Sequence, residues 1–210
     1  MRITVVGTGA VGRTLAAGLG ALGHEVVVAT RDPEATRARP EWDVAAPLVA
    51  LPGAEEDAAL VVNATAGTAS LEALRALGDL AGKVVLDVSN PLDFSAGFPP
   101  TLAVKDTDSL AEQLQRGLPG ARVVKALNTM TAGVMLQPHL VGDGTSTVLV
   151  AGDDEDAKGV VVGLLESAGW RDVLDLGPLE AARGMEMWLP LWLRVMGALG
   201  TASFNLKIVR

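Results

Sequence analysis

The stretch MRITVVGTGAVG, residues Met1 to Gly12, decides the fold of this chain. Its apolar run Ile3–Val6 is rich in β-branched side chains and predicts a strand that is covered on both faces. The Ala- and Leu-rich run Val11–Leu22 predicts a helix, and Gly23 stands where a glycine commonly follows a helix end. Glycines with G-x-G-x-x-G spacing join the two elements. A strand, a glycine turn and a helix in this order predict the first unit of an α/β fold.

Each glycine of this turn has a physical task in proteins that bind a dinucleotide. The first permits a tight turn, the second lets backbone approach a pyrophosphate, and the third lets the helix pack closely on the strand. The pyrophosphate then lies at the helix N-terminus, where N–H groups and the helix dipole attract anions. A glycine-rich turn without a ligand is the alternative. The candidate pyrophosphate-binding residues are Gly7, Thr8, Gly9, Ala10, Val11 and Gly12.

The second predicted strand, Glu25–Ala29, ends in Thr30 and Arg31. NAD-binding versions of this unit place an acidic residue here, which accepts hydrogen bonds from the ribose hydroxyls. A carboxylate would repel a 2′-phosphate, whereas a hydroxyl and a guanidinium can bind it. We therefore expect NADP(H), held by Thr30 and Arg31. Two alternatives stay open: Arg31 is a solvated loop cation, or a longer strand brings Asp32 to the ribose.

The rest of the chain alternates apolar strand-like runs with helical stretches, which predicts an α/β fold of the Rossmann type with a parallel sheet. We expect an NADP-binding Rossmann domain over residues 1–152. A small, mostly helical part over residues 153–210 is expected to pack on this domain and to form a dimer interface. Further strands are expected at Leu60–Asn63, Lys83–Val88, Arg122–Ala126, Thr147–Ala151 and Asp172–Asp175.

Two segments of the second part have a specific interpretation. Asp153–Asp156 is an acidic cluster ahead of an expected helix at Ala157–Ala168, and we predict that it caps this helix rather than binds a metal. The apolar segment Trp188–Gly200 is interrupted by Pro190 and Arg194 and falls short of a membrane span, so we expect a buried helix.

Ligands of open parallel sheets bind beyond the carboxyl ends of the strands, so the residues that follow each strand form one candidate set. Small or polar residues expected to flank the nicotinamide half of the cofactor are Asn63, Ala64, Thr65 and Ala126. A second-substrate pocket is expected from Asn90, Pro91, Leu92, Asn128, Met185 and Met187. Ordinary turn formation is the alternative for the Asn and Thr residues, and a core or dimer-interface helix is the alternative for the Met-rich segment.

Lys125 directly precedes one of these loops. A catalytic amine is one reading of this residue. We interpret it instead as a strand-end lysine that faces solvent, as is usual for lysine.

Composition argues against several classes of protein. A formal net charge of −8 disfavours nucleic acid as a partner, because binding needs Lys and Arg to displace counterions from phosphates. The chain has no cysteine and only two histidines, so we expect no disulfide, no Cys nucleophile and no metal site. The first residues enter a strand without a signal-peptide pattern, and we expect a cytoplasmic protein that does not bind membranes.

Several segments together resemble the coenzyme F420-dependent NADP oxidoreductase family and its bacterial NADPH-dependent F420 reductase-like relatives. They are Gly7–Gly9, Gly23–Val26, Thr30-Arg31, Val124–Thr129, Ala151–Asp154 and Asp175–Leu179. The resemblance covers nearly the whole chain, including Phe204–Ile208, and a more distant similarity is to the cytosolic reductase domain of membrane ferric reductases. It implies a Rossmann domain, a small helical part, a homodimer, and hydride transfer between NADP(H) and the deazaflavin F420. By this resemblance Thr8–Val11 and Thr30-Arg31 hold NADP, and Ala126 and the loop from Asn63 flank its nicotinamide end.

The chain departs from the family pattern on the side of the second substrate. The family's proline is missing from the loop Asn63-Ala64-Thr65, and the next loop reads Ser89–Leu92 in place of the family's sequence. The cofactor therefore follows more directly than the acceptor, which is expected to be F420 or a flavin. Hydride transfer between two bound heterocycles needs them close and parallel, so we expect no catalytic side chain. A reductase of small carbonyl or imine compounds and a noncatalytic NADP-binding redox sensor are the alternatives.

Overall fold

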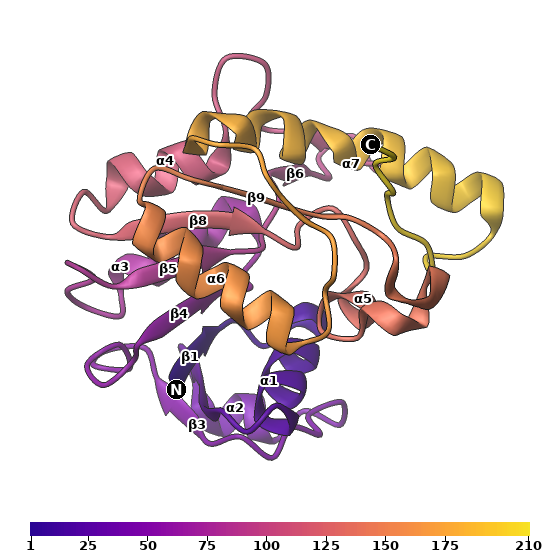
Figure 1. Cartoon of the computed structure of the whole chain (residues 1–210). Coiled ribbons are helices and arrows are strands. Elements are labelled where there is room, and N and C mark those ends of the chain that lie inside the picture. The colour runs from indigo at the N-terminus through magenta and orange to yellow at the C-terminus, as the bar shows by residue number, and fades with distance from the viewer.

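An eight-stranded sheet with helices on both faces forms the middle of the molecule (Figure 1). The computed structural model describes residues 1–210. Across the sheet the strand order is β10-β9-β8-β5-β4-β1-β2-β3, and the hairpin of β6 and β7 lies outside it. The strands are β1 Arg2–Val6, β2 Glu25–Thr30, β3 Leu48–Ala50, β4 Leu60–Asn63, β5 Val84–Asp87, β6 Leu92–Asp93, β7 Thr101–Leu102, β8 Arg122–Ala126, β9 Val148–Gly152 and β10 Val173–Asp175.

Strands β3, β2, β1, β4, β5 and β8 run parallel, and the strand order reverses between β1 and β4. This is the Rossmann arrangement, so the predicted fold class is confirmed. The sheet is mostly parallel and departs from this pattern at one end, where β9 runs antiparallel to β8 and β10 follows the direction of β9. The connection from β8 to β9 holds only the four-residue helix α5 (Ala132–Met135) and two short 3-10 turns. Without a crossover helix along the sheet, the chain re-enters it at the edge where β8 ends.

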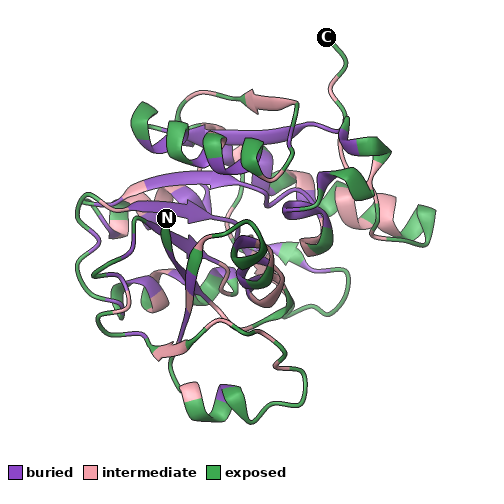
Figure 2. Ribbon diagram, turned by 60° about the horizontal axis from the view of Figure 1, so that its bottom comes forward, coloured by how far each residue is buried: buried purple, intermediate pink, exposed green.

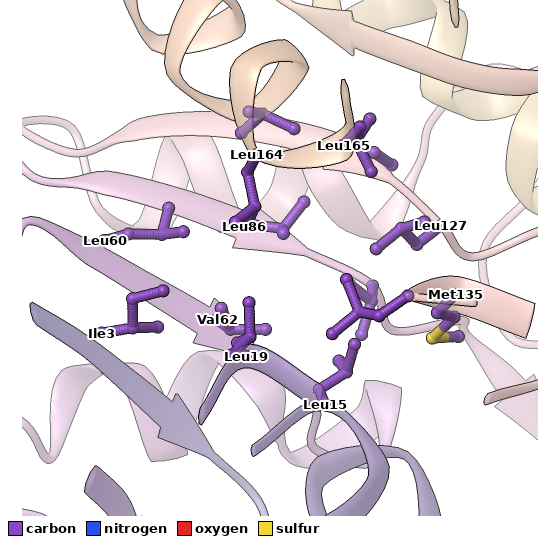
Figure 3. Packing of buried hydrophobic residues seen from close by; sticks show 14 of the residues in the cluster. Ile3, Leu15, Leu19, Leu60, Val62, Leu86, Leu127, Met135, Leu164 and Leu165 are labelled. Atoms are coloured by element: carbon purple, nitrogen blue, oxygen red, sulfur yellow. The ribbon is translucent and has the colours of Figure 1, made fainter. Parts of the chain in front are cut away.

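Two apolar cores bury the two faces of the sheet. The helices α1, α5 and α6 cover one face, and α3, α4 and the start of α7 cover the other. Figure 3 shows side chains of α1 and α6 pointing toward the sheet from two sides of the first core: Leu15, Leu19, Leu164 and Leu165 against Ile3, Val62 and Leu86. The helices are α1 Ala10–Ala21, α2 Pro33–Arg37, α3 Ser70–Arg75, α4 Leu110–Gly117, α5, α6 Glu155–Ser167 and α7 Ala182–Leu199, and the 3-10 turns are Gly67–Ala69, Pro138–Leu140, Gly142–Gly144 and Leu179–Ala181.

Burial from both faces explains why the strands are continuous apolar runs without alternation. Figure 2 shows these strands buried, whereas the outer faces of the helices are exposed. Three short strands were not expected from sequence: the hairpin strands β6 and β7, and β3, none of whose three residues is fully buried. The edge at which β1, β2, β4, β5 and β8 end, called the carboxyl edge below, carries the candidate site.

The two interpreted segments of the second part have different outcomes. Asp154 caps α6 by accepting a hydrogen bond from the Ala157 N–H at 2.7 Å, which confirms the capping role. Trp188–Gly200 lies within α7, but the expectation that it is buried is wrong: only Leu189 is buried, and Leu191 and Leu199 are 53% and 57% exposed. The second half of α7 extends past the sheet, so the sheet does not cover its apolar side chains (Figure 1). No helix of the structure is both long and apolar enough to span a bilayer.

Candidate functional site

The three glycines between β1 and α1 are required for different reasons. Gly7 has a φ of 120°, and a Cβ there would collide with the backbone of Ala64 in the loop after β4. A Cβ on Gly12 would collide with the carbonyl oxygen of Gly7. Gly9 has an ordinary φ of −75°, is exposed, and a Cβ there would meet no protein atom within 4 Å. The fold therefore explains Gly7 and Gly12, whereas Gly9 keeps a space open in front of α1.

The N-terminus of α1 faces this open space. Gly9 is the N-cap residue and offers no side chain to the free N–H groups, and the first turn contains no acidic residue. Ala10 is exposed and Val11 is half-buried, so the start of the helix is accessible. Uncapped N–H groups and the positive end of the helix dipole suit a pyrophosphate, and the open space at Gly9 fits its close approach.

The end of β2 places the predicted ribose-binding residues beside this turn. Thr30 is the last residue of the strand, its hydroxyl lies 3.2 Å from that of Thr36, and Arg31 is exposed immediately after it. Asp32 caps α2, and its carboxylate accepts a hydrogen bond from the Ala35 N–H at 2.8 Å. The strand thus ends before Asp32, and the Asp32 carboxylate already has a partner in the protein.

Arg39 is a member of this region that sequence reasoning missed. Its guanidinium donates a hydrogen bond to the Thr8 hydroxyl at 3.0 Å, across the glycine turn. Arg31, Arg37 and Arg39 are all exposed and lie within nine residues of each other, and this local density of arginine was the available signal. Guanidinium groups bind phosphate oxygens well, so Arg31 and Arg39 could hold phosphates on either side of the turn.

Polar side chains at the ends of β4 and β5 form a buried network. The Asn63 amide donates to the Asp87 carboxylate at 2.8 Å and its oxygen accepts from the Thr65 hydroxyl at 2.7 Å. The Ser89 hydroxyl also donates to Asp87, at 2.6 Å. Asn63 is fully buried, so its side chain fixes the loop, and the Ala64 backbone packs against Gly7.

The loops after β5 and β8 are joined directly. Asn90 and Asn128 exchange two hydrogen bonds of 2.9 Å, and Asn128 donates a third to the Met185 carbonyl at 3.0 Å. The Asn128 side-chain oxygen is buried and has no donor within the protein. Leu127, between Ala126 and Asn128, has a φ of 63°, a strained conformation for a side chain of this size.

The other predicted second-substrate residues have varied environments. Pro91 is buried and Leu92 begins β6. Ala126 is the buried last residue of β8. The Met185 side chain packs on Leu149 and Ala151 of β9, so only its backbone carbonyl reaches the loops, and Met187 is exposed.

Lys125 is the clearest difference between sequence and structure. The expectation that it faces solvent is wrong, because its side chain is completely buried. Its ammonium donates to the carboxylates of Asp87 at 2.7 Å and Glu186 at 2.8 Å, and to the Ser89 carbonyl at 2.6 Å. Burial opposes the ammonium charge, but the two carboxylates outweigh it and raise the pKa of Lys125 above its ordinary value. Burial also raises the pKa of Glu186, because the single Lys125 ammonium, which it shares with Asp87, does not offset the cost of burying its charge.

A hollow of about 360 Å³ lies at the opposite edge of the sheet, near the first residues of β1 and β2. Three of its four charged lining residues form ion pairs, because Arg2 lies 3.1 Å from Glu25 and 2.8 Å from Asp57. None of the predicted site residues lines this hollow. The candidate site is therefore the carboxyl edge alone.

Comparison with known proteins identifies the relatives of this chain. The family model for coenzyme F420-dependent NADP oxidoreductases matches residues 2–91, which include the glycine turn and Thr30-Arg31. The F420-dependent NADP reductase of Methanothermobacter marburgensis is 32% identical, over 91% of this chain and 90% of that protein. The chain belongs to this family. The similarity to the archaeal member extends well past residue 91, so the family relation includes the C-terminal part.

Two solved structures and a longer relative are also similar to this chain. A crystal structure from Arthrobacter sp. FB24, provisionally designated an F420-dependent NADP reductase, is 52% identical with a TM-score of 0.96 and full coverage of both chains. Metalloreductase STEAP3 of Rattus norvegicus is 31% identical over 91% of this chain, which spans only 38% of its length. A reductive aminase from Aspergillus terreus in complex with NADPH, at 22% identity and a TM-score of 0.66, shares the fold. The curated family members are NADP-dependent oxidoreductases.

Proposed function

We propose that the protein transfers a hydride between NADP(H) and a deazaflavin or flavin-like acceptor, with F420 as the leading candidate. The observation that carries this proposal is the open space at Gly9 in front of the uncapped N-terminus of α1. A fold that needs no glycine at this position, yet has one, is fitted to a pyrophosphate. Membership in a family of F420-dependent NADP oxidoreductases supports the same cofactor and names the acceptor class.

The residues after β2 favour NADP over NAD. Arg31 is exposed where the 2′-phosphate would lie, and Arg39 lies at the other side of the turn against Thr8. Asp32, the residue that could have selected an unphosphorylated ribose, is occupied as the cap of α2. An exposed guanidinium suits a phosphate dianion.

The chain's own contribution to the reaction is binding and orientation. NADPH, when bound, supplies the hydride. The loops after β4, β5 and β8 would hold the nicotinamide end, and the unpaired Asn128 oxygen is suited to accept from a carboxamide N–H. Holding two rings close and parallel removes most of the entropic barrier, so no protein acid or base is assigned.

The proposed acceptor site follows from the position of the loops after β5 and β8. Asn90, Pro91, Leu92 and Asn128 lie at the carboxyl edge next to the nicotinamide loops, and the Met185 carbonyl joins α7 to Asn128 on this side. We propose that these residues contact the acceptor. A second copy of the chain would cover the exposed apolar half of α7, which supports a homodimer, and light scattering in solution tests it.

Mixing the purified protein with NADPH and oxidised F420, and then with FMN, tests the proposed activity. We expect loss of NADPH absorbance that depends on one of these acceptors. No consumption with either acceptor, although NADPH binds, would remove the enzyme assignment and favour the redox sensor.

Exchanging Arg31 for Ala tests the choice of cofactor. We expect a weaker affinity for NADPH, with the affinity for NADH nearly unchanged, because only NADPH carries the 2′-phosphate. Arg171→Ala, an exposed arginine between α6 and β10, is the matched control. If Arg31→Ala keeps the NADPH/NADH preference of Arg171→Ala, Arg31 does not bind the phosphate.

A further inference from the structure

The buried charges around Lys125 have no role of their own in the function proposed above. Lys125 and Asp87 are fully buried, and Glu186 is 1% exposed. Lys125 lies next to the last residue of β8, Asp87 ends β5, and Glu186 belongs to α7. The cluster therefore joins three parts of the chain directly below the carboxyl edge.

Glu186 also holds the start of a fourth element. Its carboxylate accepts hydrogen bonds from the N–H groups of Leu110 at 2.8 Å and Ala111 at 3.2 Å, at the N-terminus of α4. One side chain of α7 thus binds both the Lys125 ammonium and the positive end of a helix dipole. These contacts compensate the second carboxylate of the cluster.

Two residues close to Glu186 attach α7 in a similar way. The Met185 carbonyl accepts from Asn128, and the Trp188 indole N–H donates to the Thr129 carbonyl at 3.2 Å. Three positions within one turn of α7 are therefore held by directional bonds to β8 and to the loop that follows it. The far half of the helix has no comparable attachment and is largely exposed.

Stability alone does not account for a buried ion cluster. Apolar side chains of similar volume often stabilise a protein as well as a buried ion pair, because taking charges out of water is costly. Ion pairs differ from apolar contacts in direction, since each ammonium and carboxylate bond fixes a distance and an angle. The main consequence of this cluster is then the fixed placement of α7 and of the loop Ser89–Leu92, whose Ser89 carbonyl also binds Lys125.

We propose that Lys125, Asp87 and Glu186 form a joint that holds the first half of α7 and the loop after β5 in the position required to receive the acceptor beside the nicotinamide. These are positioning residues. The acceptor part of this inference rests on the proposed function, whereas the attachment of α7 does not.

Lys125→Met tests the joint, because it keeps much of the side-chain volume and removes the charge. The ADP half of the cofactor is assigned to α1 and β2, away from the joint, so we expect the Kd for NADPH to change much less than acceptor turnover. We expect kcat/KM for the acceptor to fall about 10- to 100-fold, as small misplacements of reacting groups commonly do. Hydrogen exchange of the backbone amides in residues 185–189 is expected to become faster.

Lys158→Met is the matched control. Lys158 is also buried and also pairs with two carboxylates, Glu155 and Asp175 at 2.8 Å each, but it lies on α6 beside β10, away from the joint. We expect this control to keep wild-type kinetics with the acceptor and wild-type exchange in residues 185–189. Equal exchange in the two variants, or an NADPH affinity that falls as much as acceptor turnover, would overturn the proposal.

Glu186→Gln is a milder variant in case Lys125→Met does not fold. It keeps an acceptor for the α4 N–H groups and removes the charge, and we expect the same pattern with smaller changes. If the wild-type protein fails to oxidise NADPH with any acceptor tested, the proposed function fails. The exchange measurement still decides whether the joint holds α7.

Discussion

Gly9→Ala separates ligand binding from folding at the glycine turn. The new methyl group meets no protein atom within 4 Å, and the Gly9 backbone angles are open to any residue. We therefore expect a loss of only about 1 kcal/mol in unfolding free energy, from the poorer N-cap. The methyl occupies the space that we assign to the pyrophosphate. Losing one charge-assisted hydrogen bond there costs about 1.5 to 3 kcal/mol, which corresponds to a Kd for NADPH raised about 10- to 150-fold.

Fluorescence titration with NADPH measures this Kd, and urea denaturation measures the unfolding free energy. Gly20→Ala is the control, since this α1 residue also has open space around it and lies away from the turn. Its Kd should equal that of the wild type. Gly12→Ala should instead destabilise the fold, because its Cβ collides with the Gly7 carbonyl. A wild-type Kd in Gly9→Ala would refute the placement of the pyrophosphate.

Two further outcomes test the surroundings of the site and the far edge of the sheet. Asp32→Ala should lower the unfolding free energy by about 1 kcal/mol through loss of the α2 cap, with no change in the NADPH/NADH preference; a strong shift of that preference would instead place Asp32 at the ribose. Hydrogen bonds from Lys207, and also from Thr147 and Arg210, lower the pKa of Asp172 from 3.8 to about 2. Its contribution to stability is complete above the unfolded pKa and is lost as the pH falls through the folded pKa. The difference in unfolding free energy between the wild type and Asp172→Asn should therefore shrink between about pH 4 and about pH 2, and a difference that stays constant over this range would contradict the shifted pKa.

Local sequence determined the fold class and predicted the cofactor half of the candidate site. The run Ile3–Val6, the glycine spacing and the helix pattern after it are properties of neighbouring residues, and turn geometry follows from them without distant contacts. The same holds for the end of β2 at Thr30 and for the caps of α2 and α6, in which each Asp binds an N–H three residues ahead.

Tertiary structure alone decided the rest of the site. The local pattern around Lys125 is that of any strand-end lysine, and its burial depends on carboxylates 38 and 61 positions away in the chain. Arg39 reaches Thr8 across 31 positions, and β9 reverses because the preceding connection stays at one edge. Helical periodicity likewise predicted α7 but not which half of it the sheet would cover. The burial of a charge, the direction of a strand and the covering of an apolar face each depend on contacts with distant parts of the chain. These contacts form only when the chain folds.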